Sequence, residues 1–181
     1  MIEQLIRERR TVRDFLPTEL TPETVLELLD VAVWAPTHGN REPWRFLMFE
    51  GEGRRKLIDA LVGTFSEEDQ AKYRQGYENY LMGTPINLVV TIPRSDNPVI
   101  WEEDLCAAAC MVQNLQLVAW EREIGMVWKS GEVFNEDSFK AALSIGHEEH
   151  VMGLLILGRF HKKPKAQSRT KAELKTVIIS S

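Results

Sequence analysis

Apolar residues recur at helical spacing shortly after the N-terminus. The positions that follow the i, i+3, i+4, i+7, i+8 pattern of one buried helix face are Val25, Leu28, Leu29, Ala32 and Val33. Thr21 and Pro22 stand just before them and are typical of an N-cap and a first helical residue. Trp34 lies nine positions after Val25, about 180° around the helix from this stripe. We therefore expect Trp34 to face a ligand or a partner subunit.

Compact apolar runs bounded by turn-forming residues predict the strands. These runs cover 44–50, 85–93 and 151–160, with a shorter one inside 125–134. Helices are expected over 2–9, 53–64, 66–82, 101–123 and 136–143. The 101–123 segment contains the small residues "CAAAC", which favour close packing, so it is expected to be central. The tail, 161–181, begins basic and ends in the apolar "TVIIS", which is suited to adding a strand to a neighbour's sheet.

The composition is that of a soluble globular protein. The chain has 181 residues, of which 44% are hydrophobic and 27% charged, and this length suits one domain over 1–181. A net charge of −5 argues against a general nucleic-acid or anionic-membrane binder. No stretch approaches the ~20 apolar residues of a membrane span, and the charged start does not resemble a secretory signal. We expect a cytoplasmic protein.

The cysteines and histidines do not form a metal motif. Cys106 and Cys110 are four residues apart in a helical run, which fits no structural zinc spacing, and we expect them to be buried free thiols. "GHEEH" over 146–150 differs from the HExxH motif of zinc hydrolases. It is expected to be a loop before the strand at 151, and no metal site is predicted.

A basic segment near the start carries candidate chemistry. In "RERRTVRDF" over 7–15, Arg9, Arg10 and Arg13 surround Thr11. A solvated basic face is the ordinary interpretation of such a run, but Val12 and Phe15 interleave the arginines with apolar residues. Guanidinium groups bind phosphate and carbonyl oxygens through paired hydrogen bonds. The segment is therefore a candidate anion site.

A stiff polar turn precedes the first predicted strand. "APTHGNREPW" contains Pro36, Gly39, Asn40 and Pro43, which break helices or form turns, and a histidine at 38. A turn of this kind against a core strand usually closes the fold or receives a ligand. No single one of these features decides between the two.

Four segments together resemble the nitroreductase family of FMN-dependent oxidoreductases, in particular its small bacterial branch. They are "RRTVRDF", "APTHGNREPWRF", "CMVQNLQLVAWEREIGMVWKSG" and "LLILGRFHKKPK", and in this order they cover nearly the whole chain. The resemblance implies an α+β fold with a central mixed or antiparallel sheet flanked by helices. It also implies an obligate homodimer with FMN at the interface and a C-terminal tail exchanged between subunits.

The resemblance also assigns roles to residues of the basic segment and the tail. Arg9, Arg10 and Thr11 would hold the phosphate, the ribityl chain and the pyrimidine edge of FMN. Arg13 would lie near the flavin N1 and O2 atoms, where a cation stabilises the anionic reduced flavin. A basic residue of the tail would complete the phosphate site, with Arg169 preferred and Lys165 as the alternative.

Two further groups of residues would approach the flavin ring. Trp34, His38 and Asn40 would line the cofactor from the stiff turn, reaching the FMN held mainly by the other subunit. The other group, expected near N5 and O4, consists of Trp128, Lys129, Ser130 and Gly131. Glu42 stands where the family usually has glutamine, and we expect it to face away or to pair with Arg41 or Arg45.

The implied function is hydride transfer from NADPH or NADH through flavin N5 to a nitroaromatic, quinone or similar flat electrophile, with ping-pong kinetics. The flavin carries the chemistry, so no catalytic side chain is assigned. The alternatives are a dehalogenase, a flavin-fragmenting enzyme or an azoline dehydrogenase on the same scaffold, a non-catalytic flavin-binding module, and a structural dimer without cofactor.

Overall fold

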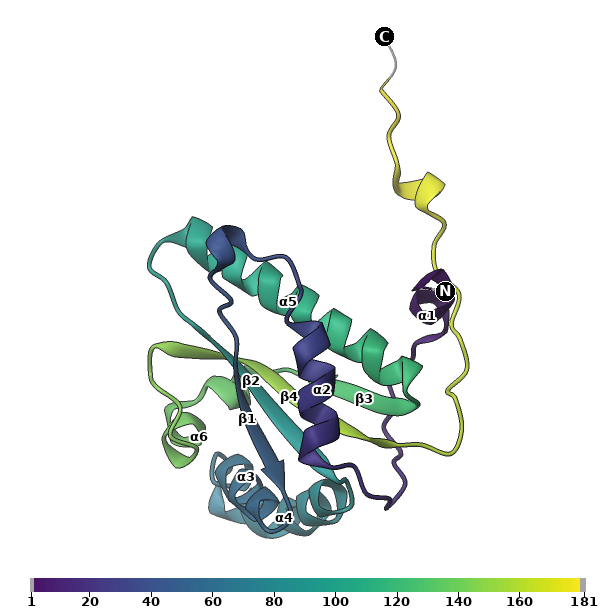
Figure 1. Cartoon of the computed structure of the whole chain (residues 1–181). Coiled ribbons are helices and arrows are strands. Elements are labelled where there is room, and N and C mark those ends of the chain that lie inside the picture. Colours follow the sequence, from purple (N-terminus) through teal and green to yellow (C-terminus); the bar gives the residue numbers. More distant parts are fainter. Residues whose placement is uncertain (1, 180–181) are drawn as a thin grey trace.

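The computed structural model describes residues 2–179, and its centre is a four-stranded antiparallel sheet (Figure 1). The strands are β1 (Arg45–Glu50), β2 (Ile86–Pro93), β3 (Ile124–Lys129) and β4 (Glu149–Arg159), in the order β1-β2-β4-β3. The α-helices are α1 (Ile2–Glu8), α2 (Pro22–Ala32), α3 (Gly53–Val62), α4 (Glu67–Met82), α5 (Pro98–Glu121) and α6 (Asp137–Ala142). Short 3-10 helices are η1 (His38–Asn40), η2 (Glu132–Asn135) and η3 (Ala172–Lys175). The predicted α+β class is confirmed.

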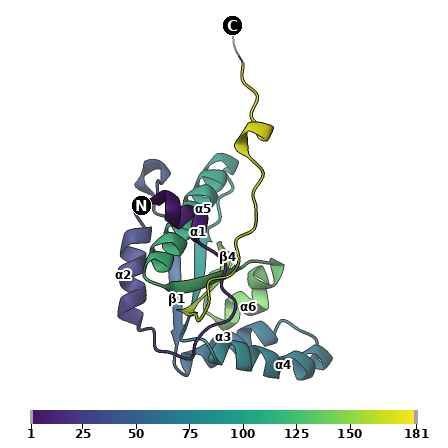
Figure 2. The same ribbon diagram turned by 90° about the vertical axis from the view of Figure 1, so that its right-hand side faces the viewer.

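Helices cover both faces of the sheet, and each face has its own core (Figure 2). Successive strand residues point to opposite faces, so Leu88 and Val90 pack towards α2 and α5 while Val89 packs towards α3 and α6. Because both faces are covered, β2 and β4 read as continuous apolar runs rather than as alternating ones. This is why their positions could be predicted from hydrophobicity alone.

Helix α2 ends earlier than its apolar pattern suggests. Its start is the predicted one, since the Thr24 backbone N–H donates to Thr21 Oγ1 at 3.3 Å and Pro22 is the first helical residue. The last helical residue is Ala32, so Trp34 lies in the turn that follows and not on the helix. Trp34 is 87% exposed, and its predicted outward position is therefore confirmed although its predicted helical setting is wrong.

The two cysteines lie on the outer side of α5. The face of this helix that meets the core carries Asp104, Ala107, Ala108 and Met111 at helical spacing. Cys106 and Cys110 fall between these positions, and both are exposed free thiols. Their predicted burial is wrong, because the small residues of "CAAAC" pack inwards and turn the cysteines away.

A β-bulge at Gly153 shapes the end of β3. Val90 pairs with Gly153 and Thr91 with Val151, so the register of β2 against β4 shifts at this point. Gly153 has φ +141°, and a Cβ on it would lie 2.3 Å from the Lys129 carbonyl oxygen. The same Cβ would lie 2.6 Å from Trp128 Nε1, which donates to the Met152 carbonyl at 2.9 Å. Only glycine therefore allows β3 to approach β4 this closely.

The side chain of Glu149, the first residue of β4, is hydrogen-bonded to β1, to β2 and to the loop before β4. Arg45 of β1 donates to its two oxygens at 2.7 and 2.5 Å, and Thr91 Oγ1 donates at 2.6 Å. The Gly146 backbone N–H donates at 2.9 Å. These hydrogen bonds hold the pKa of Glu149 at about 2, against 4.5 ordinarily, although burial acts in the opposite direction. Glu149 and His150 thus belong to a strand, and the expectation of a loop throughout "GHEEH" is wrong.

Replacing Glu149 by glutamine is expected to lower the free energy of unfolding at neutral pH by about 1–3 kcal/mol, because charge-assisted hydrogen bonds are lost. The folded-state pKa lies below the unfolded one, so this stabilisation is complete above pH 4.5 and disappears as the pH falls towards about 2. Urea unfolding of wild type and Glu149→Gln, from neutral pH down to about pH 2, measures this difference in stability. Glu148→Gln is the control, and a wild-type advantage that does not shrink with acid would contradict the assignment.

The C-terminal segment leaves the body of the molecule as an extended chain (Figures 1 and 2). Its apolar residues Leu174, Val177, Ile178 and Ile179 are 74–94% exposed. The predicted tail forms η3 and no strand over its described part, and Ser180 and Ser181 lie outside the described residues. Between residues 2 and 179, none of the helices combines the length and the apolar character needed to cross a bilayer.

Candidate functional site

The arginine-rich segment after α1 runs along the free edge of β3. Thr11 forms a parallel bridge with Met126, and the Val12 backbone N–H donates to the Met126 carbonyl at 3.0 Å. The Val12 side chain is 2% exposed and packs against Gly125. Burying Val12 leaves its neighbours Thr11 and Arg13 on the exposed side. The alternation of arginine and apolar residues is therefore what lets one segment be anchored and still present cations.

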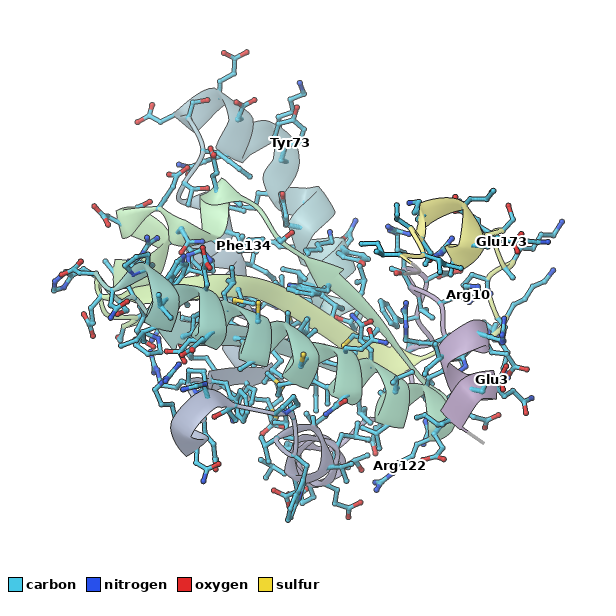
Figure 3. The ribbon with its side chains drawn as sticks, turned by 90° about the horizontal axis from the view of Figure 1, so that it is seen from above. Glu3, Arg10, Tyr73, Arg122, Phe134 and Glu173 are labelled. Carbon is cyan, nitrogen blue, oxygen red and sulfur yellow. The ribbon has the colours of Figure 1, made fainter. Side chains whose placement is uncertain are left out.

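A pocket of about 330 Å³ lies between this segment and the beginning of the tail. Its lining residues are Arg9, Arg10, Thr11, Arg13, Pro164, Lys165, Gln167 and Arg169. Five of these eight residues are lysine or arginine and none is acidic, so the pocket is strongly positive. Seen from above, Arg10 lies between α1 and the tail (Figure 3). The structure thus brings the predicted segment together with both tail candidates.

Two guanidinium donors in this pocket lack partners. Among the described residues, Arg9 Nε and Arg10 Nε are buried side-chain atoms without a hydrogen bond. The Arg10 side chain is held by the backbone, since its Nη1 donates to the carbonyls of Arg7 at 2.7 Å and Arg9 at 2.6 Å. Burial, followed by repulsion from Arg10 and Arg169, lowers the pKa of Arg9. An unpaired buried donor is costly, and a bound anion would remove that cost.

Lys129, the last residue of β3, places another positive charge near the arginine segment. Its Nζ lies 4.5 Å from the centre of the Tyr80 ring of α4. Burial, with a smaller contribution from the nearby Arg13, lowers the pKa of Lys129. Trp128 precedes Lys129 in the strand and packs on the opposite face, against the core under α2 and α5. The structure therefore does not bring these two predicted side chains together, and the indole N–H is already bonded to Met152.

Ser130 and Gly131 follow the strand and line a different pocket. It has a volume of about 520 Å³, and Arg94 and His150 form part of its wall. The Arg94 Nη2 and His150 Nδ1 atoms are 3.3 Å apart, and burial, followed by the nearby Arg94 and Lys140, lowers the pKa of His150. A neutral imidazole can accept a hydrogen bond from Arg94, which explains this pairing of two basic residues.

The stiff turn contains three residues with left-handed backbone, Gly39, Asn40 and Glu42, and one ion-pair cluster. Gly39 and Asn40 have φ of 61° and 52°, a conformation that glycine and asparagine tolerate best. Arg41 donates to Glu103 at 2.7 Å and to Asp104 at 2.8 Å, which fastens the turn to α5. His38 Nδ1 also lies 3.4 Å from a Glu103 oxygen.

Glu42 takes no part in this cluster. Arg41 is bonded to α5 and Arg45 to Glu149, so the expected pairing of Glu42 with either arginine is wrong. Glu42 lies exposed with φ 45°, and its backbone N–H donates to Thr37 Oγ1 at 3.3 Å. The other expectation, that Glu42 faces away from the cofactor, stays a prediction.

The predicted site residues fall into groups that one chain does not join. The turn with His38 and Asn40 meets α5 at Glu103, near the start of that helix. Helix α1, which leads into the arginine segment, packs near Leu117 and Glu121 at the other end (Figure 1). The two ends are about 20 Å apart along the helix axis. The turn residues and the arginine pocket therefore cannot line the same site within one subunit.

A model of the nitroreductase family matches residues 6–159. The chain belongs to the nitroreductase family. The match starts before the arginine segment and ends with β4, so it includes the turn and the end of β3. The implied family is therefore confirmed, together with its nitroreductase-like fold.

Relatives of this nitroreductase-family chain cover nearly its whole length. A Bacillus subtilis (strain 168) protein provisionally named NAD(P)H nitroreductase YfhC is 32% identical over 174 residues, covering 94% of this chain and 90% of its own. The crystal structure of a nitroreductase-like family protein from Bacillus cereus has a TM-score of 0.97 at 36% identity, covering 100% and 97% of the two chains. A provisionally named nitroreductase from Desulfovibrio desulfuricans, solved in complex with FMN, has a TM-score of 0.74 at 26% identity, covering 96% and 94%.

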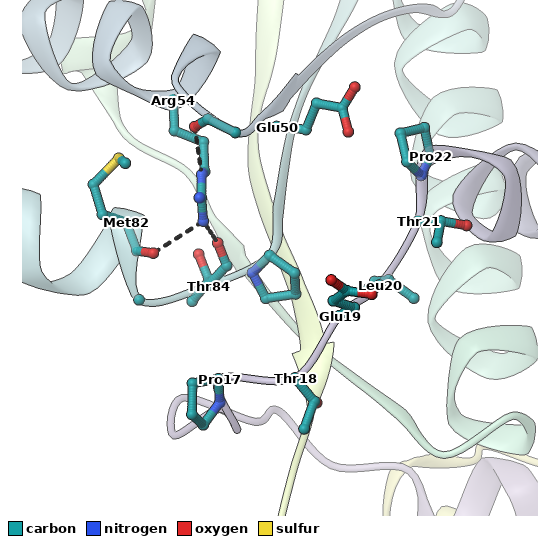
Figure 4. Close-up of a pocket in the computed structure, with 13 residues that line it drawn as sticks. Pro17, Thr18, Glu19, Leu20, Thr21, Pro22, Glu50, Arg54, Met82 and Thr84 are labelled. Carbon is teal, nitrogen blue, oxygen red and sulfur yellow. Dashed lines mark hydrogen bonds between the residues drawn. The ribbon is translucent and has the colours of Figure 1, made fainter.

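Another pocket of this nitroreductase-family fold, of about 540 Å³, contains none of the predicted residues (Figure 4). Arg54 in its wall donates to the carbonyls of Met82 and Thr84 through Nη1, and to that of Gly51 through Nε at 2.9 Å. This guanidinium is used to hold two loops together. Glu19 and Glu50 add negative charge to the same wall. The pocket is therefore poorly suited to a phosphate, in contrast to the arginine pocket.

Proposed function

We propose that this chain is an FMN-dependent oxidoreductase that takes electrons from NADPH or NADH and reduces a nitroaromatic, a quinone or a similar flat electrophile. The observation that carries the proposal is the pair of buried, partnerless donors Arg9 Nε and Arg10 Nε in a pocket lined by five cations. Membership of the nitroreductase family and the relative solved with FMN support the same cofactor.

The arginine pocket suits the phosphate of FMN. Phosphate oxygens accept the two free Nε–H groups, and the negative charge offsets the repulsion between Arg9 and Arg169. Thr11 adds a hydroxyl at the pocket wall. Arg169 and Lys165 both reach the pocket from the tail, with Arg169 the preferred ligand because its charge acts on Arg9.

The other end of the arginine segment suits the flavin ring. The segment that contains Arg13 runs parallel to β3, so Arg13 lies beside the end of this strand. Lys129 adds a second positive charge there. FMN, when bound, supplies the redox chemistry by accepting a hydride at N5 from the nicotinamide and passing two electrons to an acceptor. The protein residues bind and orient it, and the two cations favour its anionic reduced form. One binding face serving donor and acceptor in turn gives ping-pong kinetics.

We further propose that a complete site requires a homodimer. The turn with His38 and Asn40 lies too far from the arginine pocket to join it within one chain, so a second copy would bring the two groups together. Trp34 is 87% exposed, as a residue that covers a partner's cofactor would be. Among the described residues, strand β1 pairs only with β2, which leaves its outer edge of the sheet unpaired. The apolar end of a partner's tail is suited to pair with that edge.

Replacing Ile178 by aspartate is expected to weaken this dimer at least tenfold. Ile178 is 85% exposed in the single chain, and burying an isoleucine side chain contributes about 1.5–3 kcal/mol. Sedimentation over a range of concentrations measures the dissociation constant. Lys175→Ala, in the same tail, is the control. Unchanged dimerisation of the Ile178 variant would rule out the exchanged tail.

Initial rates at varied donor and acceptor concentrations test the proposed reaction. Ping-pong turnover predicts parallel double-reciprocal lines with NADPH or NADH and a quinone or nitroaromatic acceptor. A protein that binds FMN but gives no turnover with either donor would instead be a flavin-binding module. Turnover that destroys the flavin or removes a halide from the substrate would favour the specialised enzymes on this scaffold.

A further inference from the structure

Lys129 and Arg13 are neighbouring cations without a carboxylate partner. Among residues 2–179, no ion pair or side-chain hydrogen bond involves either of them, although many other arginines are paired. The charge of Arg13 acts on Lys129, and Lys129 is also partly removed from water. A lysine has a long flexible stem, and repulsion would turn its ammonium group towards solvent. Another group must therefore keep the ammonium beside Arg13.

The ring of Tyr80 is the group in contact with this ammonium. Lys129 Nζ lies 4.5 Å from the ring centre, which is within cation–π range. The ring is itself held in place, because it packs against the core under α3 and α6, and the next residue, Leu81, is 1% exposed. Burial raises the pKa of Tyr80, so the phenol stays neutral and its ring keeps an electron-rich face.

We propose that Tyr80 is a positioning residue whose ring holds the Lys129 ammonium next to Arg13, so that both charges act on the redox-active end of the cofactor. The effect on the cofactor rests on the proposed function, whereas the effect on Lys129 does not. Tyr80 lies on α4, outside every segment that carries the family resemblance. Through this contact, a residue of helix α4 fixes the position of a positive charge at the end of β3.

Removing the ring should release Lys129 into solvent. In Tyr80→Leu the attraction is lost while the repulsion by Arg13 remains, so the ammonium moves away from the site. The positive field on bound flavin then falls, and the anionic reduced form is less stabilised. The flavin midpoint potential should become more negative. Tyr80→Phe keeps the ring and should leave both the lysine position and the potential close to wild type.

The first measurement uses the protein without cofactor. NMR titration of labelled lysine side chains follows the pKa of Lys129 in wild type, Tyr80→Leu and Tyr80→Phe. The leucine variant should raise this pKa towards its ordinary value, because the ammonium leaves a partly buried place beside Arg13, and the phenylalanine variant should not. Tyr73→Leu is the matched control, since Tyr73 lies on the same helix with Lys72 Nζ 4.9 Å from its own ring centre. An unchanged pKa in Tyr80→Leu overturns the proposal.

The second measurement is the midpoint potential of the FMN-loaded protein in a double-mutant cycle with Lys129→Met. The proposal predicts a negative shift in Tyr80→Leu that disappears when Lys129 is already replaced. A shift that persists in the Lys129→Met background means that Tyr80 acts by another route, and overturns the proposal. If Lys129→Met itself leaves the potential unchanged, the placement of the flavin beside Lys129 fails instead. The lysine titration then still decides whether Tyr80 positions that side chain.

Discussion

Replacing Arg9 by alanine is expected to weaken FMN binding by about 1.5–3 kcal/mol, or roughly 10- to 150-fold in Kd. The buried Nε of Arg9 has no partner within the described chain, and we propose the FMN phosphate as its acceptor. The same substitution removes repulsion from Arg10 and Arg169. The cofactor-free protein should therefore be no less stable than wild type. If Arg9 served only the fold, the variant would bind FMN as wild type does and would be less stable.

Fluorescence titration of the cofactor-free protein with FMN measures the affinity, and urea unfolding measures the stability. Arg7→Ala is the control, because Arg7 lies two residues earlier, on α1, and within residues 2–179 its side chain pairs only with Glu3, in an exposed contact. Arg9→Lys keeps the charge but not the forked donor geometry, and should recover part of the affinity. Wild-type affinity in Arg9→Ala would show that the phosphate lies elsewhere.

Replacing Gly153 by alanine is expected to lower the free energy of unfolding by about 3 kcal/mol or more, from a strained φ and a clash with backbone. The added Cβ would lie 2.3 Å from the Lys129 carbonyl oxygen, which cannot move without breaking the pairing of β3 with β4. The end of β3 carries the turn with Ser130 and Gly131, so flavin affinity should fall as well.

Urea unfolding of Gly153→Ala against Gly76→Ala tests this prediction. Gly76 lies inside α4 with open space around its Cα, and alanine there should stabilise the protein by about 0.5–1 kcal/mol. The two substitutions are chemically identical and are expected to act in opposite directions. A Gly153 variant as stable as wild type would mean that β3 and β4 are not packed as closely as described.

The local patterns predicted most of the fold and the position of the arginine segment. The cap at Thr21, the apolar stripe behind it and the buried strands are local signals, and each element formed within a few residues of its expected range. The arginine segment was also found from sequence, because the burial of Val12 forces its neighbours outwards. The apolar runs of β2 and β4 are continuous because helices cover both faces of the sheet.

The remaining features depend on contacts between distant parts of the chain. Glu149 bonds to Arg45 and Thr91, which are far from it in sequence, so nothing in "GHEEH" reveals its role. Tyr80 of α4 meets Lys129 at the end of β3 although the two residues are far apart in sequence. The side chains of Trp128 and Lys129 point to opposite faces because successive residues of a strand alternate. A strand was expected here, so this separation was predictable from the sequence.

The visible spectrum of the purified protein, recorded anaerobically before and after addition of NADPH and then of NADH, tests the central claim most directly. We predict the absorption bands of an oxidised flavin and their loss on addition of at least one donor, which also identifies that donor. Flavin bands that persist with both donors would contradict the oxidoreductase and leave a flavin-binding module. A colourless protein that FMN cannot reconstitute would mean that Arg9 and Arg10 serve the fold alone.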